Sequence, residues 1–205
     1  MENFKRFWED PELDRINNMV RWNGLNRIKD ETVAHHSYIV AFFSRILAEE
    51  IFEDNEMKFL ILSYALSHDY DEIFTGDILN PFKYNEFNGN EVRGVIDDFL
   101  KFKIEQKFNT DSATDKMFRD VLNKTIIPPI ARKIVKIADW ISMYFYLKKE
   151  RQLGNMGVDP QNRHCIQNIR LTCQDAIDYL NENSEGSQLV VNIDILEEIK
   201  NTHFI

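Results

Sequence analysis

Apolar positions repeat at α-helical spacing along most of the chain. Within residues 29–52 one stripe recurs at intervals of three and four: Val33, His36, Val40, Phe43 and Leu47. A neighbouring stripe is also largely apolar and comprises His35, Ile39, Phe42 and Ile46. Such intervals mark the buried faces of a helix. The pattern therefore predicts a helix over this segment that is buried on most of its sides.

The same periodicity predicts helices on both sides of this segment. A first helix is expected over residues 11–21, because Asp10 suits the N-cap and Pro11 the first helical position. Further helices are expected over residues 54–69, 91–108, 112–123 and 130–150, and around Ile166, Ile169, Cys173, Ile177 and Leu180. Residues 70–90 predict a loop, and residues 187–200 predict a short strand or a strand followed by a helical turn.

Composition supports a helical fold. The chain of 205 residues has only 7 glycines and 5 prolines, whereas sheets and their turns need more of both. This length suits one domain, and the sequence contains no linker long enough to divide it. We therefore predict an all-α fold, a single helical bundle over residues 1–205. Its core would span about 15–150 and a C-terminal helical extension would span 160–205.

The formal net charge of −9 limits the partners of the chain. Sequence-independent binding of nucleic acid needs a basic surface, which an acidic chain does not offer. For the same reason, an anionic substrate would have to be held by a local cation. The sequence has neither an apolar run of the ~18 residues that cross a membrane nor a signal-peptide core. Cys165 and Cys173 are too few for a disulfide framework and are expected to be buried on one helix. We expect a cytoplasmic protein with no nucleic-acid or membrane partner.

Candidate chemistry concentrates in LSHDYDEIFTGD, residues 66–77, where acidic and imidazole side chains directly follow an apolar run. Polar residues also interrupt the other two strongly apolar helices, as His36 and as Asp139. A carboxylate deep in such a helix is costly unless it is paired or bound to a metal. Two imidazoles and two carboxylates suit one divalent ion of borderline hardness, such as Mn, Fe, Co, Ni or Zn. The predicted ligands are His36, His68, Asp69 and Asp139.

Each predicted ligand also has a purely structural explanation. His36 alone would be explained as a hydrogen-bonded core residue. Asp69 alone would be explained as a cap at a helix end. Asp139 alone would be explained as an ion-pair partner of Lys136 or Arg132. The metal site is favoured because four such side chains occur together on three separate segments.

Three segments carry a resemblance to a known family. The order H…HD…D runs through RINNMVRWNGLNRIKDETVAHHSYIVAFFSRIL, ALSHDYDEIFTGDILNPFKY and KIADWISMYFYLKKE. This order resembles HD-domain phosphohydrolases. The Arg-Trp pair, the His-Ser dipeptide and H-D-x-x-E-x-x-T-G-D are similar to the YfbR-like branch of bacterial 5′-deoxynucleotidases. Phage dATP triphosphohydrolases are similar in the same segments, residues 15–84 and 134–150.

The resemblance separates two candidate histidines. Periodicity alone leaves open whether His35 or His36 is the ligand. The family places its ligand directly before a serine, here Ser37, which implies His36. The family often has Glu where this chain has His35 and a small residue where it has Asp71. These two departures concern the surroundings of the predicted metal site and leave its four ligands intact.

Two further carboxylates are candidates for catalysis. Glu72 lies three residues after Asp69, so we expect it to handle or position the water as an acid or base. By resemblance Asp77 is a second catalytic carboxylate that orients the water or protonates the leaving oxygen. Taken alone, Asp77 has a second explanation as a turn cap after Gly76.

Four residues are candidates for substrate binding. The planar fork of Arg21 suits phosphate oxygens. The resemblance implies that Trp22 packs against the sugar and excludes a 2′-hydroxyl, although core packing is the alternative. Thr75 belongs to the same set by resemblance. Lys83 is either a phosphate contact or a solvated loop lysine.

Together these features predict a metal-dependent phosphohydrolase of 2′-deoxynucleotides. The substrate is expected to be a deoxynucleoside monophosphate, as in 5′-deoxynucleotidases, or a triphosphate, as in dATP triphosphohydrolases. Co, Mn or Zn is expected as the metal, with Mg as a further candidate. The alternative is a non-catalytic metal-binding regulatory protein. A homodimer is expected from the resemblance and from the apolar surface of MYFYLKKE and the C-terminal helix.

Overall fold

The computed structural model describes residues 10–76, 89–183 and 192–204. The regular elements of the described residues are helices. One isolated antiparallel bridge, between Val20 and Thr32, lies between the first two of them. The helices are α2 (Pro11–Asn18), α3 (Val33–Ile51), α4 (Asn55–Ser67), α5 (Glu72–Thr75), α7 (Gly89–Lys107), α8 (Ala113–Leu122), α9 (Pro129–Gln152), η1 (Met156–Val158), α10 (Asp159–Asn183) and α11 (Asp194–Asn201). The predicted all-α fold is confirmed.

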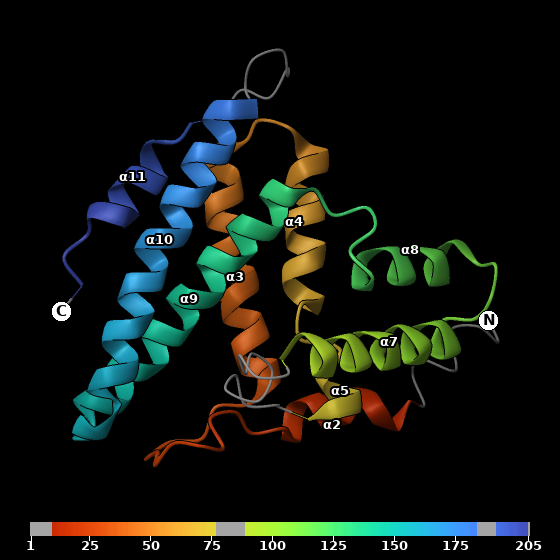
Figure 1. The fold of residues 1–205 in the computed structure, drawn as a ribbon, viewed down its shortest axis with the longest axis horizontal. Coiled ribbons are helices and arrows are strands. Elements are labelled where there is room, and N and C mark those ends of the chain that lie inside the picture. The colour runs from red at the N-terminus through yellow and green to blue at the C-terminus, as the bar shows by residue number, and fades with distance from the viewer. Residues whose placement is uncertain (1–9, 77–88, 184–191, 205) are drawn as a thin grey trace.

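Helix α9 is the centre of the bundle. It lies alongside α10 and crosses α3 and α4 obliquely, while α11 covers the outer face of α10 (Figure 1). Pro128 and Pro129 begin α9, because proline at the first helical position costs no hydrogen bond. Its residues Ile134, Ile137 and Leu147 are fully buried in the core. A polar residue on this helix therefore lies next to well-packed apolar side chains.

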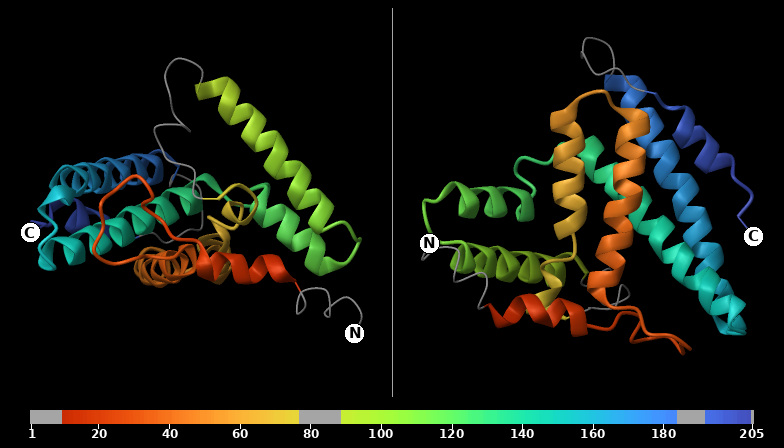
Figure 2. Two further views of the ribbon diagram at one scale, coloured as in Figure 1. Left: turned by 90° about the horizontal axis from the view of Figure 1, so that it is seen from below. Right: turned by 180° about the vertical axis from the view of Figure 1, so that it is seen from behind.

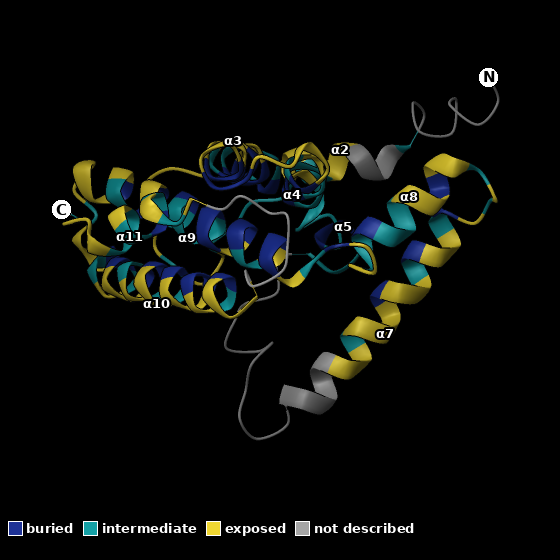
Figure 3. Cartoon of the chain, turned by 90° about the horizontal axis from the view of Figure 1, so that it is seen from above, coloured by how far each residue is buried: buried dark blue, intermediate teal, exposed yellow. Residues whose placement is uncertain are grey.

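Helices α7 and α8 lie on the other side of α4 from α10, as the views in Figures 1 and 2 show. Most described residues of α7 are exposed (Figure 3), whereas Leu100, Ile104 and Phe108 are buried at helical spacing. Asp115 in the first turn of α8 accepts hydrogen bonds from the backbone and hydroxyl of Thr110. These contacts fix the turn between α7 and α8, and with it one wall of the cavity described below.

The described boundaries correct two expectations. The first helix ends at Asn18, three residues earlier than predicted. The chain beyond it pairs with the residues before α3: the N–H of Arg21 donates to the carbonyl of Glu31 at 2.8 Å. Residues 70–90 were expected to be a loop, but α5 begins at Glu72 and α7 begins at Gly89. Pairing with the residues before α3 follows directly on the end of the first helix, and local periodicity does not report such pairing.

The C-terminal residues correct a third expectation. Within residues 192–204 the chain forms a helix, α11 (Asp194–Asn201), where the expectation was a short strand or a strand followed by a helical turn; residues 187–191 lie outside the described residues. Leu196 is fully buried, and Ile195 and Ile199 pack against the core. Both cysteines are buried on α10 as expected. No helix among the described residues meets the length and hydropathy that a membrane span requires.

Glu150, near the end of α9, holds the segment before α3 in place. Its side chain is 1% exposed. Its two carboxylate oxygens accept hydrogen bonds from the backbone N–H groups of Ile28 at 2.7 Å and Lys29 at 2.8 Å. The amide of Asn155 donates a third bond at 2.8 Å. Burial alone would raise the pKa of Glu150, but these donors and the charge of Arg27 lower it below its ordinary value.

We expect Glu150→Gln to lower the free energy of unfolding by about 2–3 kcal/mol at pH 7, since bonds to a buried carboxylate are charge-assisted. The contribution of the carboxylate is fully present above the unfolded pKa of about 4.3. This contribution is lost as the pH falls through the lowered folded-state pKa. The difference in the free energy of unfolding between wild type and Glu150→Gln should therefore become smaller in acid. Urea unfolding at pH 7 and in mild acid measures both. The exposed Glu182→Gln is the matched control, and an equal effect of the two substitutions would contradict the assignment.

Candidate metal and substrate site

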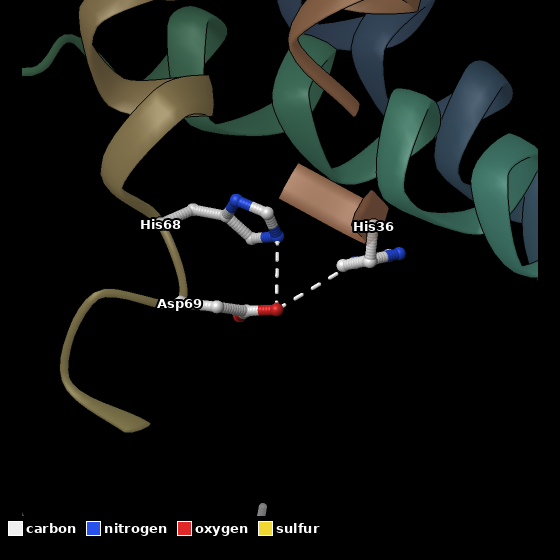
Figure 4. A group of neighbouring side chains, drawn as sticks. All are labelled: His36, His68 and Asp69. Atoms are coloured by element: carbon white, nitrogen blue, oxygen red, sulfur yellow. Dashed lines mark ion pairs between the residues drawn. The ribbon is translucent and has the colours of Figure 1, made fainter. Parts of the chain in front are cut away.

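Three helices bring the predicted ligands to one place. His36 lies in the first turn of α3, whose N-cap Thr32 accepts a hydrogen bond from the N–H of His35 at 3.2 Å. His68 is the C-cap residue of α4, and Asp69 follows it directly. Figure 4 shows these two side chains turned toward His36. Asp139 lies in the middle of α9, which packs against both α3 and α4.

The distances within this cluster are short. The Nε2 atom of His68 lies 3.3 Å from Oδ2 of Asp69, and Nε2 of His36 lies 3.6 Å from the same oxygen. One ligand atom from each of these three residues lies within 4.8 Å of the others. Asp139 joins the cluster through His36, whose Nε2 is 3.1 Å from its Oδ1. The four residues predicted from sequence are therefore neighbours in space.

The orientation of the two imidazoles fits a metal site. Nδ1 of His68 lies 2.8 Å from the carbonyl oxygen of Ala65, which can only accept, so Nδ1 carries the hydrogen. The lone pair of a neutral His68 then lies on Nε2, which faces the cluster. Nδ1 of His36 lies 3.0 Å from Oγ of Ser142. Both Nε2 atoms are buried and make no hydrogen bond within the described residues. A metal-ligating histidine is usually held by a hydrogen bond through one ring nitrogen and binds the metal through the other. Both rings of this cluster are held through Nδ1 and direct Nε2 at the carboxylates.

The electrostatics of the cluster favour ionised carboxylates. Burial alone would raise the pKa of Asp69, but His68 and Arg21 lower it. Burial would also raise the pKa of Asp139, but Lys136, His68 and Arg21 lower it. Burial alone would lower the pKa of His68, yet Asp69 and Asp139 raise it to about 9. Two nitrogen and two charged oxygen donors suit a divalent transition metal, which must compete with a proton on His68.

Arg21 and Trp22 stand beside the cluster. Nη1 of Arg21 lies 3.6 Å from Oδ2 of Asp69, and the guanidinium is largely buried. Trp22 has a φ of 66°, which is uncommon for a residue other than glycine. Its Nε1 donates to Oε2 of Glu31 at 2.9 Å, and its ring stacks on Tyr146 with centroids 5.2 Å apart. These contacts hold the Trp22 side chain in place. Trp22 is partly buried against the core, as the alternative of core packing expected.

The remaining candidates are divided between described and undescribed residues. Glu72 begins α5 and is buried, and its N–H donates to the carbonyl of Asp69 at 3.1 Å. Thr75 is half-buried and lines the same cavity as Asp69. Asp77 and Lys83 lie outside the described residues. The structure thus places Glu72 within one short turn of the cluster.

The cluster opens into a cavity of about 380 Å³. Besides His68, Asp69 and Asp139, its walls include three basic residues that the sequence did not single out for binding: Lys124, Arg132 and Lys136. Arg132, Lys136 and Asp139 follow one another on one stripe of α9, and Nζ of Lys136 donates to Oδ2 of Asp139 at 2.7 Å. The ion pair considered as an alternative for Asp139 is therefore present, with Lys136. Asp71 and Asp97 also line this cavity, so Lys124 and Arg132 are the individual side chains that suit an anionic ligand.

The positions of Arg132 and Lys136 could have been predicted from the sequence. The spacing Arg-x-x-x-Lys-x-x-Asp places all three side chains on one helix face. Lys124 had no such pattern, because it follows α8 with a φ of 60° and reaches the cavity only through the packing of α8 on α4. A second cavity of about 830 Å³ shares Tyr64, His68, Lys124 and Arg132 with the first. The site therefore continues past the cluster toward α7 and α8.

An all-helical bundle that joins a histidine, a His-Asp pair and a later aspartate at one point defines the class of HD-domain phosphohydrolases. The chain belongs to the family of YfbR-like 5′-deoxynucleotidases, whose family model matches residues 11–185. A 5′-deoxynucleotidase of Pasteurella multocida is 30% identical over 152 residues, which are 70% of this chain and 74% of that protein. One of Pectobacterium atrosepticum is 26% identical over 170 residues, 82% of this chain and 84% of that protein.

Solved structures share the fold. The cyanophage S-2L HD phosphohydrolase DatZ, bound to dA and one catalytic Zn²⁺ ion, matches with a TM-score of 0.65 and 15% identity over 93% of this chain and 91% of that chain. An HD-domain phosphohydrolase from Listeria innocua matches with a TM-score of 0.62 and 20% identity over 88% of this chain and 86% of that chain. The predicted family, fold and enzyme class are confirmed. The chain is a metal-dependent phosphohydrolase of deoxynucleotides, and the non-catalytic alternative is disfavoured.

Proposed function

We propose that the chain removes the 5′-phosphate of 2′-deoxynucleoside monophosphates, with one divalent transition-metal ion held by His36, His68, Asp69 and Asp139. One observation carries this proposal. Two buried imidazoles, each held through Nδ1, direct unbonded Nε2 atoms at two ionised carboxylates. The name of the family supports the substrate class. The Zn²⁺ ion of DatZ supports a transition metal, and Co and Mn suit the same donors, with Mg a weaker fit.

A divalent ion at this site supplies Lewis acidity and lowers the pKa of a bound water. The chain's own residues do the rest of the work. Arg21, already directed at Asp69, offers its fork to the phosphate oxygens. Glu72 moves a proton to or from the water or the leaving oxygen, and Asp77 is its proposed partner. Thr75 and Lys83 complete the proposed substrate contacts.

Selection of deoxyribose is proposed to depend on the rigidity of Trp22. The ring is fixed between Tyr146 and Glu31, so it forms a wall that does not move aside for a larger sugar. A 2′-hydroxyl pressed against an indole face would also lose its hydrogen bonds to water. We therefore expect ribonucleoside monophosphates to be poor substrates.

A panel of substrates tests the proposal. Phosphate release is measured from deoxy- and ribonucleoside mono- and triphosphates, with Mn, Co, Zn or Mg each added to metal-stripped protein. We expect release from deoxynucleoside monophosphates, dependent on a transition metal, and at least about tenfold slower release from ribonucleotides. No release from any nucleotide with any metal would overturn the proposed function.

A second candidate substrate is a deoxynucleoside triphosphate. The observation that favours it is the stripe of Arg132 and Lys136 together with the adjoining cavity of about 830 Å³, which offer charge and space for further phosphates. Release of phosphate from triphosphates in preference to monophosphates would select this candidate. Both substrates use the same metal cluster.

Arg132→Ala is expected to raise KM for the nucleotide about tenfold or more, with kcat changed by less than about threefold. A charge-assisted hydrogen bond to phosphate contributes about 1.5–3 kcal/mol, and 1.4 kcal/mol corresponds to a factor of ten. Steady-state kinetics of the purified variant measure this. Lys133→Ala is the matched control, because Lys133 is the next residue on α9 and pairs with Asp175 away from the cavity. Equal KM values for wild type and Arg132→Ala would exclude Arg132 from substrate binding.

We also propose that the protein is a cytoplasmic homodimer. Phe42 is 53% exposed on α3, and its ring lies against that of Phe43 with centroids 5.8 Å apart. Of the MYFYLKKE segment, Tyr144, Tyr146 and Leu147 are buried within the chain, so the exposed apolar surface is smaller than the sequence suggested. Sedimentation equilibrium measures the mass in solution.

A further inference from the structure

A third cavity is lined by residues of α3 and α9 and by the segment before α3. Its volume is about 370 Å³, within the range of small-molecule sites, and it is enclosed by residues 29–32, α3 and α9. It shares no lining residue with the cavity of the metal cluster. Its walls are largely apolar and include Ile39, Phe145 and Tyr146. The function proposed above makes no use of it.

Two lysine side chains lie at the rim of this cavity. Lys29 and Lys149 both line it and both are exposed. Both line one cavity, and in agreement with this Lys29 lowers the pKa of Lys149 below its ordinary value. Like charges held together destabilise each other unless an anion lies between them. The rim is thus arranged to bind a negative group.

The carboxylates on the same rim are already engaged. Asp30 accepts from Arg27 at 2.6 Å, and Glu31 accepts from Trp22 at 2.9 Å. Glu150 accepts from two backbone N–H groups and from an amide. Within the described residues no ion pair joins a carboxylate to either lysine. Asp30 is thus paired with Arg27, whereas Glu31 and Glu150 are held by neutral donors, so the two lysines are the groups of this rim that can contact an anion.

The apolar wall indicates the rest of that ligand. Phe145 is 58% exposed, with its ring at the cavity, so a planar ring can stack on it. An anion of two charges beside an aromatic wall suits a phosphate joined to a base. We propose that this cavity is a second nucleotide-binding site, with the phosphate between Lys29 and Lys149 and the base against Phe145.

A nucleotide in this cavity would touch the supports of the catalytic site. Ser142 lines the cavity, and its Oγ lies 3.0 Å from Nδ1 of His36. Tyr146 also lines it, and its ring stacks on Trp22. The occupant therefore lies one side chain away from a predicted metal ligand and one side chain away from the proposed sugar wall. Binding here is expected to alter turnover in the other site.

The test uses trinitrophenyl-AMP, whose fluorescence rises in apolar surroundings and whose modified ribose does not fit the proposed deoxyribose site. We expect saturable binding to the intact protein. Lys149→Glu should weaken it at least tenfold, whereas Lys148→Glu, the same charge change one residue earlier and outside the cavity, should leave it within twofold. Ile39→Trp fills the cavity without changing charge and should abolish binding. Far-UV circular dichroism checks the fold of each variant.

Displacement and a second variant identify the site and the ligand. AMP should displace the probe at concentrations where inorganic phosphate does not, and displacement by phosphate alone would overturn the nucleotide assignment. Arg132→Ala should bind the probe like wild type, and loss of binding in this variant would place the probe in the catalytic cavity and overturn the proposal. Wild-type binding by both Lys149→Glu and Ile39→Trp would overturn it as well. None of these measurements needs turnover, so they stand apart from the test of the proposed function.

Discussion

His36→Gln is expected to remove the bound metal and to lower turnover at least about a thousandfold. The ion contributes several kcal/mol to stabilisation of the transition state, and each 1.4 kcal/mol is a factor of ten in rate. Glutamine keeps the length of the side chain but offers no imidazole nitrogen at the position of Nε2, which faces Asp69 and Asp139. Metal content by mass spectrometry and phosphate release from a deoxynucleoside monophosphate measure the two losses.

The neighbouring histidine gives the control. His35 is 64% exposed, and its Nδ1 lies 3.8 Å from Glu31 on the side away from the metal cluster. His35→Gln should keep the metal and turn over substrate within about threefold of wild type, as exposed substitutions usually leave stability unchanged. Full metal content in His36→Gln, or its loss in His35→Gln, would reverse the choice between the two histidines.

The fold was predictable where local pattern and tertiary packing agree. The helix over residues 29–52 was expected from two apolar stripes, and α3 (Val33–Ile51) buries Val33, His36 and Val40 of the first stripe. The first helix was predicted too long because periodicity does not report the pairing of Val20 with Thr32, which lies twelve residues further on. For the tail, local pattern left a short strand or a helical turn open, because Val and Ile suit either state; the helix α11 is fixed by the burial of Leu196 in the core.

The candidate site divides in the same way. His68, Asp69 and Asp139 were predictable because polar groups within or directly after an apolar run are costly and visible in the sequence, whereas the choice of His36 over His35 came from the family resemblance. The structure brings them together through the packing of α3 and α4 on α9. Lys124 escaped prediction since its position depends on how α8 meets α4, and the fixation of Trp22 depends on Tyr146, far along the chain. Residues whose roles depend on a distant partner carry little local signal.

Glu72→Gln is expected to keep the metal and lower kcat by about 10²–10⁴, the usual contribution of a general acid or base. The substitution preserves shape and removes only the ability to carry a proton. Glu72 is buried, and it begins α5 immediately after Asp69, so a ligand role and a proton-transfer role both suit its position. Metal content separates the two roles. A ligand variant loses the ion, as expected for His36→Gln, whereas a proton-transfer variant loses the rate and one limb of the pH–rate profile.

The control for this last prediction is Glu53→Gln, the same chemical change at an exposed position between α3 and α4. It should leave metal content, kcat and the pH–rate profile unchanged. A Glu72→Gln protein with wild-type kcat would remove Glu72 from the chemistry and leave Asp77 as the remaining candidate for proton transfer. A variant that lacks the metal would instead make Glu72 a fifth donor. Since the proposed ligands His36, His68, Asp69 and Asp139 would supply two nitrogens and two carboxylates without Glu72, retention of the metal is the outcome that the cluster favours.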